Sequence, residues 1–165
     1  MDISLYLINY IQSRIDYSTN TLELYIADTI QSSTIEIIIK DDGKKINDEK
    51  VNSKTFAGLL ELSRSLGGQI SHLYHRKQTT VQFEFQITEK SKVNINDFHS
   101  LFGVMMLNNP SVNIVFSYLS KKGEYTLNSL EIIQAFEPSE LLQKEILIYM
   151  NELLSDHLNQ IRDAL

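Results

Sequence analysis

The residues with the clearest chemical potential are Asp41, Asp42 and Gly43, which directly follow a run of β-branched residues. That run predicts a buried strand over 34–40, because it contains Ile35, Ile37, Ile38 and Ile39. An acid at the mouth of a buried strand, followed by a glycine that lets backbone approach closely, can hold a small polar ligand. The same residues also make an ordinary turn that ends a strand. This stretch alone leaves both interpretations open.

Metal chemistry is disfavoured at the histidines. His72 and His75 are three residues apart in a predicted strand, so they point to opposite faces and cannot hold one metal ion without a bulge. His99 and His157 lie on predicted helices, with no partner at ligand spacing. Asp41 and Asp42 carry oxygen ligands suited to Mg²⁺, but consecutive strand residues diverge, and a turn explains the pair more simply. No metal site is therefore predicted.

Other chemistry-bearing motifs are missing from the sequence. It contains no Gly-x-Ser-x-Gly, no Walker-type loop and no HExxH. Aromatic residues alternate along two predicted strands, at Phe83, Phe85, Phe116 and Tyr118. This alternation favours core positions over a platform for stacking bases.

Composition excludes several classes of function. The chain has 165 residues, 42% hydrophobic and 22% charged, as expected for one folded domain or one domain with an extension. Its net charge is −6, and its basic residues form no cluster longer than two, which disfavours binding to DNA or RNA. No apolar run reaches the ~20 residues of a membrane span, and no signal peptide is visible. Cysteine is absent, which fits a reducing cytoplasm.

The first half of the chain reads as helix, hairpin, helix. A helix is predicted over 2–16, capped by Asp2 or Ser4. Its core face is formed by Leu5, Ile8, Ile11, Gln12 and Ile15. A half-exposed strand over 21–30 pairs with the buried strand as a hairpin. After a polar loop over 44–53, helical spacing returns over 55–66, and Gly67-Gly68 ends that helix.

The second half reads as a hairpin followed by a mixed tail. Strands over 69–74 and 79–87 form the hairpin, and a polar stretch over 88–94 predicts a subdomain boundary. The tail is expected to hold a helix, a two-stranded hairpin, a short helix capped by Asn128 or Ser129, and a long helix that begins near Pro138. Apolar residues form a wide stripe on that last helix. It packs on its own domain or, as the less favoured alternative, forms a dimer interface.

The order of these elements resembles the GHKL (Bergerat-fold) ATP-binding domain of gyrase, sensor histidine kinases and MutL. The chain is most similar to small stand-alone bacterial ATP-binding, histidine-kinase-like proteins with a C-terminal extension. The resemblance rests on segments at 5–13, 39–43, 66–68, 109–116 and 125–165. It implies an α/β two-layer sandwich, with a mixed sheet and helices on one face. A degenerate GHKL-like domain would span 1–90, and a helix–hairpin–helix–helix extension 91–165.

The resemblance also implies where a nucleotide would bind, and there the chain departs from the family. It maps a degenerate site onto Asn9, Gln12, Ser13, Asp41, Gly43 and Ile46. Asn9 stands at the position of the acid that activates water, and it has no useful basicity. Ser13 stands at the position of the asparagine that ligates Mg²⁺, and is a poor substitute. Asp41 keeps the acid that would accept the adenine amino proton, but Lys45 replaces the second glycine and would crowd the base pocket unless the loop is rebuilt.

The phosphate-binding lid is the largest departure from the family. The family wraps the triphosphate with glycine backbone, whereas 46–56 contains no glycine and is too short for the usual lid. Gly58 is the nearest glycine, but its place in a helical pattern favours a packing role.

Taken together, these features predict a non-catalytic pseudo-ATPase, a binding or regulatory module that acts through a protein partner and needs no cofactor. The alternative is a residual nucleotide-binding protein or weak ATPase that takes ATP or ADP with Mg²⁺, using Asp41 and Gly43 with phosphate contacts from Lys44, Lys45 or Lys54. A third hypothesis is a subunit of a larger complex, docked or homodimerised through the last helix.

Overall fold

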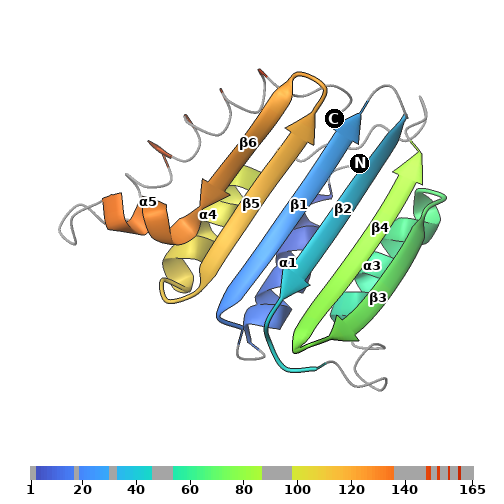
Figure 1. Ribbon diagram of the computed structural model, residues 1–165, viewed down its shortest axis with the longest axis horizontal. Coiled ribbons are helices and arrows are strands. Elements are labelled where there is room, and N and C mark those ends of the chain that lie inside the picture. The colour runs from blue at the N-terminus through green and yellow to red at the C-terminus, as the bar shows by residue number, and fades with distance from the viewer. Residues whose placement is uncertain are drawn as a thin grey trace.

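A single six-stranded mixed sheet organises the computed structural model, with strand order β3-β4-β2-β1-β5-β6 (Figure 1). The structure describes residues 3–16, 19–29, 33–45, 54–86 and 98–135, together with helical positions 148, 149, 152, 156 and 160. The strands are β1 (Thr21–Thr29), β2 (Thr34–Asp41), β3 (Gln69–His75), β4 (Gln78–Gln86), β5 (Asn113–Ser120) and β6 (Gly123–Asn128).

Three hairpins and one parallel pairing build the sheet. Strands β1 and β2, β3 and β4, and β5 and β6 pair antiparallel, and β2 also pairs antiparallel with β4. Strand β5 lies parallel to β1, which joins the two halves of the chain in one sheet. The predicted division between 1–90 and 91–165 falls outside the described residues and stays a prediction, but the strands on both sides of it share this sheet.

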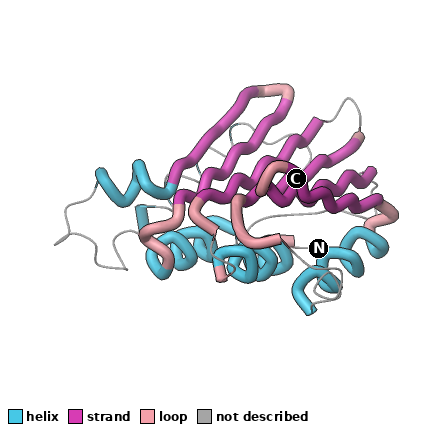
Figure 2. The backbone as a smooth tube through the Cα atoms, turned by 60° about the horizontal axis from the view of Figure 1, so that its bottom comes forward, coloured by secondary structure: helices cyan, strands magenta, loops and turns pink. Residues whose placement is uncertain are grey.

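Helices cover one face of the sheet, so the fold has two layers (Figure 2). The described helices are α1 (Ser4–Ile15), α3 (Lys54–Ser65), α4 (Phe98–Asn108) and the short α5 (Ser129–Ala135). Helix α1 lies at the centre and packs against both α3 and α4. This arrangement confirms the predicted α/β two-layer class with a mixed sheet.

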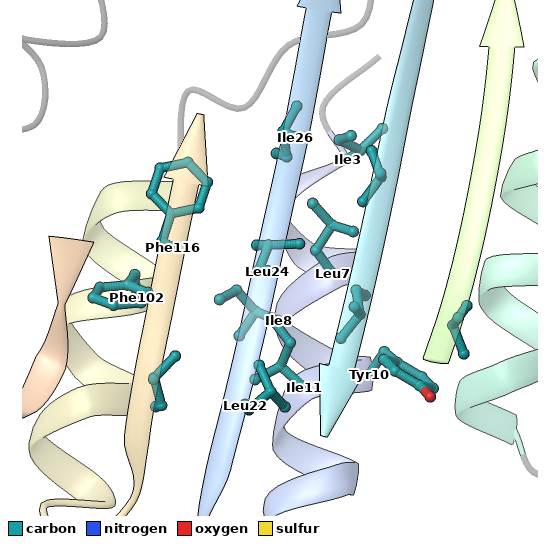
Figure 3. Packing of buried hydrophobic residues seen from close by; sticks show 14 of the residues in the cluster. Ile3, Leu7, Ile8, Tyr10, Ile11, Leu22, Leu24, Ile26, Phe102 and Phe116 are labelled. Carbon is teal, nitrogen blue, oxygen red and sulfur yellow. The ribbon is translucent and has the colours of Figure 1, made fainter. Parts of the chain in front are cut away.

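The core lies between α1 and the central strands (Figure 3). Alternate residues of each strand point toward the helices, including Leu22, Leu24 and Ile26 of β1 and Ile35, Ile37 and Ile39 of β2, all at most 1% exposed. The predicted aromatic core positions Phe83, Phe85, Phe116 and Tyr118 are buried as well. The intervening residues line the opposite, open face of the sheet. The period-two alternation therefore assigned the faces of the sheet correctly.

Turn chemistry also follows the sequence. Gly67 has φ +68° after α3, its amide donates to Arg64 O and the Gly68 amide donates to Ser63 O, the pairing of a Schellman cap. Arg76 and Lys77 form the β3–β4 loop with φ 49° and 63°, as a two-residue type I′ turn requires. Asn128 Oδ1 accepts the amides of Leu130 and Glu131, and thus caps α5 as predicted.

Two predictions for the first helix are wrong. Leu5 is 58% exposed rather than part of the core face, because the buried stripe runs through Leu7, Tyr10, Ile11 and Arg14. Ser4 lies inside α1, whose N-cap Ile3 has no side-chain cap, so Ser4 is not the cap. The alternative cap, Asp2, lies outside the described residues.

Several predicted features fall outside the described residues. These are the loop over 46–53, the boundary over 88–94, Pro138 and most of the apolar stripe on the last helix. Tyr149 of that stripe is 41% exposed. Within the described ranges, none of the helices is long and apolar enough to cross a membrane.

Candidate functional site

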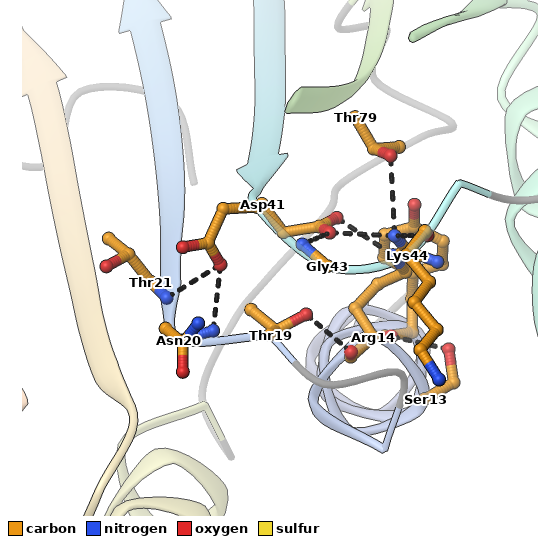
Figure 4. Close-up of polar contacts among 11 residues, drawn as sticks. Ser13, Arg14, Thr19, Asn20, Thr21, Asp41, Gly43, Lys44 and Thr79 are labelled. Atoms are coloured by element: carbon orange, nitrogen blue, oxygen red, sulfur yellow. Dashed lines mark hydrogen bonds and ion pairs between the residues drawn. The ribbon is translucent and has the colours of Figure 1, made fainter. Parts of the chain in front are cut away.

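The candidate site lies where the C-terminal end of α1 meets the end of β2 (Figure 4). Asp41, the last residue of β2, is 1% exposed. Arg14, in the last turn of α1, reaches it with a bidentate ion pair: Nε donates to Oδ2 at 2.9 Å and Nη2 donates to Oδ1 at 2.8 Å. Such parallel charge-assisted bonds are among the strongest that a carboxylate forms in a protein.

Two further acceptors surround the Arg14 guanidinium. Nη2 also donates to the backbone oxygen of Lys44 at 2.7 Å and to Thr79 Oγ1 at 3.3 Å. The Gly43 amide donates to Asp41 Oδ1 at 3.0 Å, which closes a local turn. Both oxygens of Asp41 are therefore engaged, and one buried network joins α1, β2, the loop after β2 and β4.

The backbone around the site is fixed by its own polar contacts. Thr19 Oγ1 donates to Arg14 O just beyond the end of α1. Asp42 turns away from Asp41: its Oδ1 accepts the amides of Asn20 and Thr21 at 2.8 and 2.9 Å. The prediction that the two acids diverge is thus confirmed. Asp42 ties the start of β1 to the end of β2, while Asp41 holds the helix.

Tyr10 lies one turn before Arg14 on the same buried face of α1. Its ring is 1% exposed, and its hydroxyl has no hydrogen-bond partner within the described residues. Burial raises the pKa of the Tyr10 phenol well above its ordinary value; the positive charge of Arg14 opposes this shift and the negative charge of Asp41 adds to it. The phenol therefore stays neutral beside the ion pair.

The structure brings together only part of the predicted nucleotide site. Asp41 and Gly43 lie in the network, whereas Ser13 Oγ donates to the backbone of Tyr10 at 2.7 Å and Asn9 is exposed. Gln12 donates to Asp16 at 3.0 Å and accepts from Asn109 at 3.2 Å, so it holds α1 and the end of α4 together. Ile46 lies outside the described residues.

The expected crowding of a base pocket by Lys45 stays a prediction. Lys45 is exposed, and its Nζ lies 5.6 Å from the centre of the Tyr74 ring. The side chain beside Asp41 is that of Arg14, which sequence reasoning missed. A signal was present: Arg14 falls three residues after Ile11 and seven after Leu7, a core position at which a cation needs a buried partner.

The prediction that His72 and His75 point to opposite faces of the sheet is confirmed. His72 and His75 alternate along β3, with His72 half-buried and His75 exposed, so they lie on opposite faces. Among the residues that the structure describes, His, Cys, Asp and Glu form no group that could hold a metal ion. The His99 side chain and His157 lie outside the described set.

Comparisons with known proteins support the fold class and nothing beyond it. No family model matches the chain, and no curated protein matches it. The crystal structure of the N-terminal domain of a DNA repair protein is similar, with a TM-score of 0.51 and 15% identity over 77% of this chain and 51% of that one. The chain thus spans about half the length of that structure, and at this identity the likeness extends only to the α/β fold.

Proposed function

We propose that this chain is a non-catalytic, GHKL-like pseudo-ATPase that works in the cytoplasm as a binding or regulatory module for a protein partner. The observation that carries the proposal is the ion pair between Arg14 and Asp41. In the family that the sequence resembles, the acid at this position accepts the amino group of adenine. Here Arg14 and Gly43 already occupy both oxygens of that acid.

Energetics support this interpretation. A nucleotide that took the place of Arg14 at Asp41 would have to break this buried pair, and removing one partner of such a pair costs about 3–5 kcal/mol. A site that would otherwise bind with micromolar affinity, about −8.2 kcal/mol, would then retain about −3 to −5 kcal/mol, which is a Kd of about 0.2 to 6 mM.

The two helix positions that the resemblance assigns to the general base and the Mg²⁺ ligand also support a non-catalytic protein. Asn9 is exposed on α1, and the Ser13 hydroxyl is bonded to its own helix. An amide and a hydroxyl in these settings supply neither a general base nor a strong Mg²⁺ ligand. The proposal therefore includes no catalytic residue and no cofactor.

One observation favours the alternative of residual nucleotide binding. Oxygens of Asp41 and Thr79 both accept hydrogen bonds from the planar guanidinium of Arg14. Two exposed lysines, Lys44 and Lys45, lie shortly after Asp41 in the chain. An adenine amino group could take the place of the guanidinium, with the lysines near its phosphates. This alternative requires Arg14 to swing away from Asp41.

Isothermal titration with ADP and ATP, each with and without Mg²⁺, separates the two functions. We expect no saturable heat from the wild-type protein at low-millimolar nucleotide. Saturable binding that is lost in Asp41→Asn and kept in Asp42→Asn would overturn the proposal. Asp42→Asn is the matched control, because it removes the same charge from the adjacent residue, whose carboxylate points away from Arg14.

A further inference from the structure

The open face of the sheet, turned toward the viewer in Figure 1, carries a shallow hollow of about 380 Å³ over its central strands. The side chains that line it on this face are Glu23, Tyr25, Ile38, Lys40, Val115 and Ser117. Tyr25 lies opposite Ile38 on one side and Ser117 on the other. The hollow therefore has an aromatic and aliphatic floor near the middle of this face.

Negative charge exceeds positive charge on the face around this floor. Glu23, Glu36, Glu84 and Glu124 point to this face from four strands. Lys40 lies directly opposite Glu23, and Glu36 accepts a hydrogen bond from Gln82 at 2.9 Å. The carboxylates act on the floor itself, because the pKa of Tyr25 is raised by burial and then by Glu36 and Glu124. An aromatic ring within the electric field of several carboxylates is a favourable binding position for a cation.

Charge also excludes the competing occupants. Nucleic acid and anionic lipid would be repelled by this face, and a second copy meeting it with the same face would bring like charges together. Residues 136–165 of the chain carry six acidic and two basic side chains, so they are poorly matched as well. A positively charged segment of another protein is the occupant that fits.

We propose that the open face binds a basic segment of a partner protein, with a lysine or arginine side chain over the Tyr25 ring between Glu23 and Glu36. This inference rests on the proposed function only in assuming a protein partner, and it is independent of the ion pair at Asp41. The aliphatic groups of Ile38 and Val115 would pack against the stem of the cationic side chain.

A fluorescein-labelled octapeptide of alternating arginine and leucine is a suitable probe, measured by anisotropy at two salt concentrations. We expect saturable binding that weakens with salt, and an affinity lowered on the order of tenfold by Glu23→Gln combined with Glu36→Gln. The matched control is Glu61→Gln combined with Glu131→Gln, which changes the net charge equally at exposed positions on α3 and α5. The control pair should bind like the wild type.

Two more variants test the details. Lys40→Gln should strengthen binding, because it removes the competing cation from the hollow. Tyr25→Phe should retain binding and Tyr25→Ser should weaken it, because the ring rather than the hydroxyl faces the cation. An equal loss of peptide affinity in the two double glutamate variants, or no binding of the peptide by the wild type, would overturn this proposal. Neither result bears on the pseudo-ATPase proposal, which the nucleotide titration tests separately.

Discussion

Arg14 and Asp41, 27 residues apart in the sequence, form a two-point ion pair between the helical layer and the sheet, with side chains 2% and 0% exposed. Burying two charges is costly, so such a pair adds less to stability than its short distances suggest. Its stronger effect is on specificity, since Arg14 finds its acceptors only when α1, β2 and β4 are in their native places. The pair thus ties α1 to the end of β2 and engages both oxygens of the acid.

Breaking this pair should destabilise the protein strongly. Arg14→Met leaves Asp41 buried without a counter-charge, and we expect it to lower the free energy of unfolding by about 3–5 kcal/mol. Urea denaturation followed by circular dichroism measures this loss. Arg64→Met is the control, because Arg64 lies at the same place in α3 but is exposed, and should change stability by less than about 0.5 kcal/mol.

A second substitution should restore much of that loss. In the double variant Arg14→Met with Asp41→Asn, no charge is buried, and the asparagine oxygen still accepts the Gly43 amide. The double variant should therefore be more stable than Arg14→Met alone. Additive losses in this cycle would show that the two side chains do not interact energetically.

Much of the fold could be predicted because the chain is locally consistent. Alternation in β1, β4 and β5 marked the buried face, β-branched residues marked β2 as a strand, and Gly67 and Asn128 marked helix boundaries through their backbone chemistry. The parallel pairing of β5 with β1 could not be predicted from local pattern. It depends on contacts about 90 residues apart, such as Leu24 with Phe116.

The candidate site was predicted only in part, for a similar reason. The sequence marks Asp41 and Gly43 as the end of a strand, so their position was predicted correctly. The partner of Asp41 was missed, because an arginine near the end of a helix is ordinarily a solvated cation that complements the helix dipole. Only tertiary packing shows that Arg14 points inward, and this changes the meaning of Asp41 from an open acceptor to an engaged one.

The space left by Arg14 should accept a small planar cation. In Arg14→Ala the acceptors of Asp41, Lys44 and Thr79 still converge on one place. We expect millimolar ethylguanidinium to raise the melting temperature of Arg14→Ala and not that of the wild type, by binding the folded state only. Ethylammonium, with the same charge but without the planar fork, should have a smaller effect. An equal response to the two cations would argue against bidentate recognition.

Tyr10→Phe should stabilise the protein by about 1 kcal/mol at neutral pH, because it removes a buried hydroxyl that has no partner within the described residues. It should also reduce the loss of stability in alkali. The pKa of Tyr10 is higher in the folded than in the unfolded state, so the unfolded state loses this proton first as pH rises. The contribution of the neutral phenol to the free energy of unfolding is therefore complete below about pH 10 and declines above that value.

Urea titrations at pH 7, 9 and 10.5 test both effects. Some alkaline loss should remain in Tyr10→Phe, because burial, followed by Tyr149, raises the pKa of Tyr125 to about 12. Tyr6→Phe is the control, since the Tyr6 side chain is 40% exposed and should change neither quantity. A Tyr10→Phe variant that is less stable than wild type at pH 7 would mean that its hydroxyl is satisfied.

Two glycines near each other in sequence should respond oppositely to alanine. Gly58 lies inside α3, and a Cβ there would meet its nearest neighbour, Tyr6 Cδ1, at an ordinary 3.7 Å. Gly58→Ala should therefore raise the free energy of unfolding by about 0.5–1 kcal/mol through helix propensity. A Cβ on Gly68 would lie 2.5 Å from Glu84 O, so Gly68→Ala must displace backbone and should cost about 1–3 kcal/mol. Urea denaturation measures both changes, and destabilisation by Gly58→Ala would instead point to a conformation of α3 that needs glycine, as a nucleotide lid would.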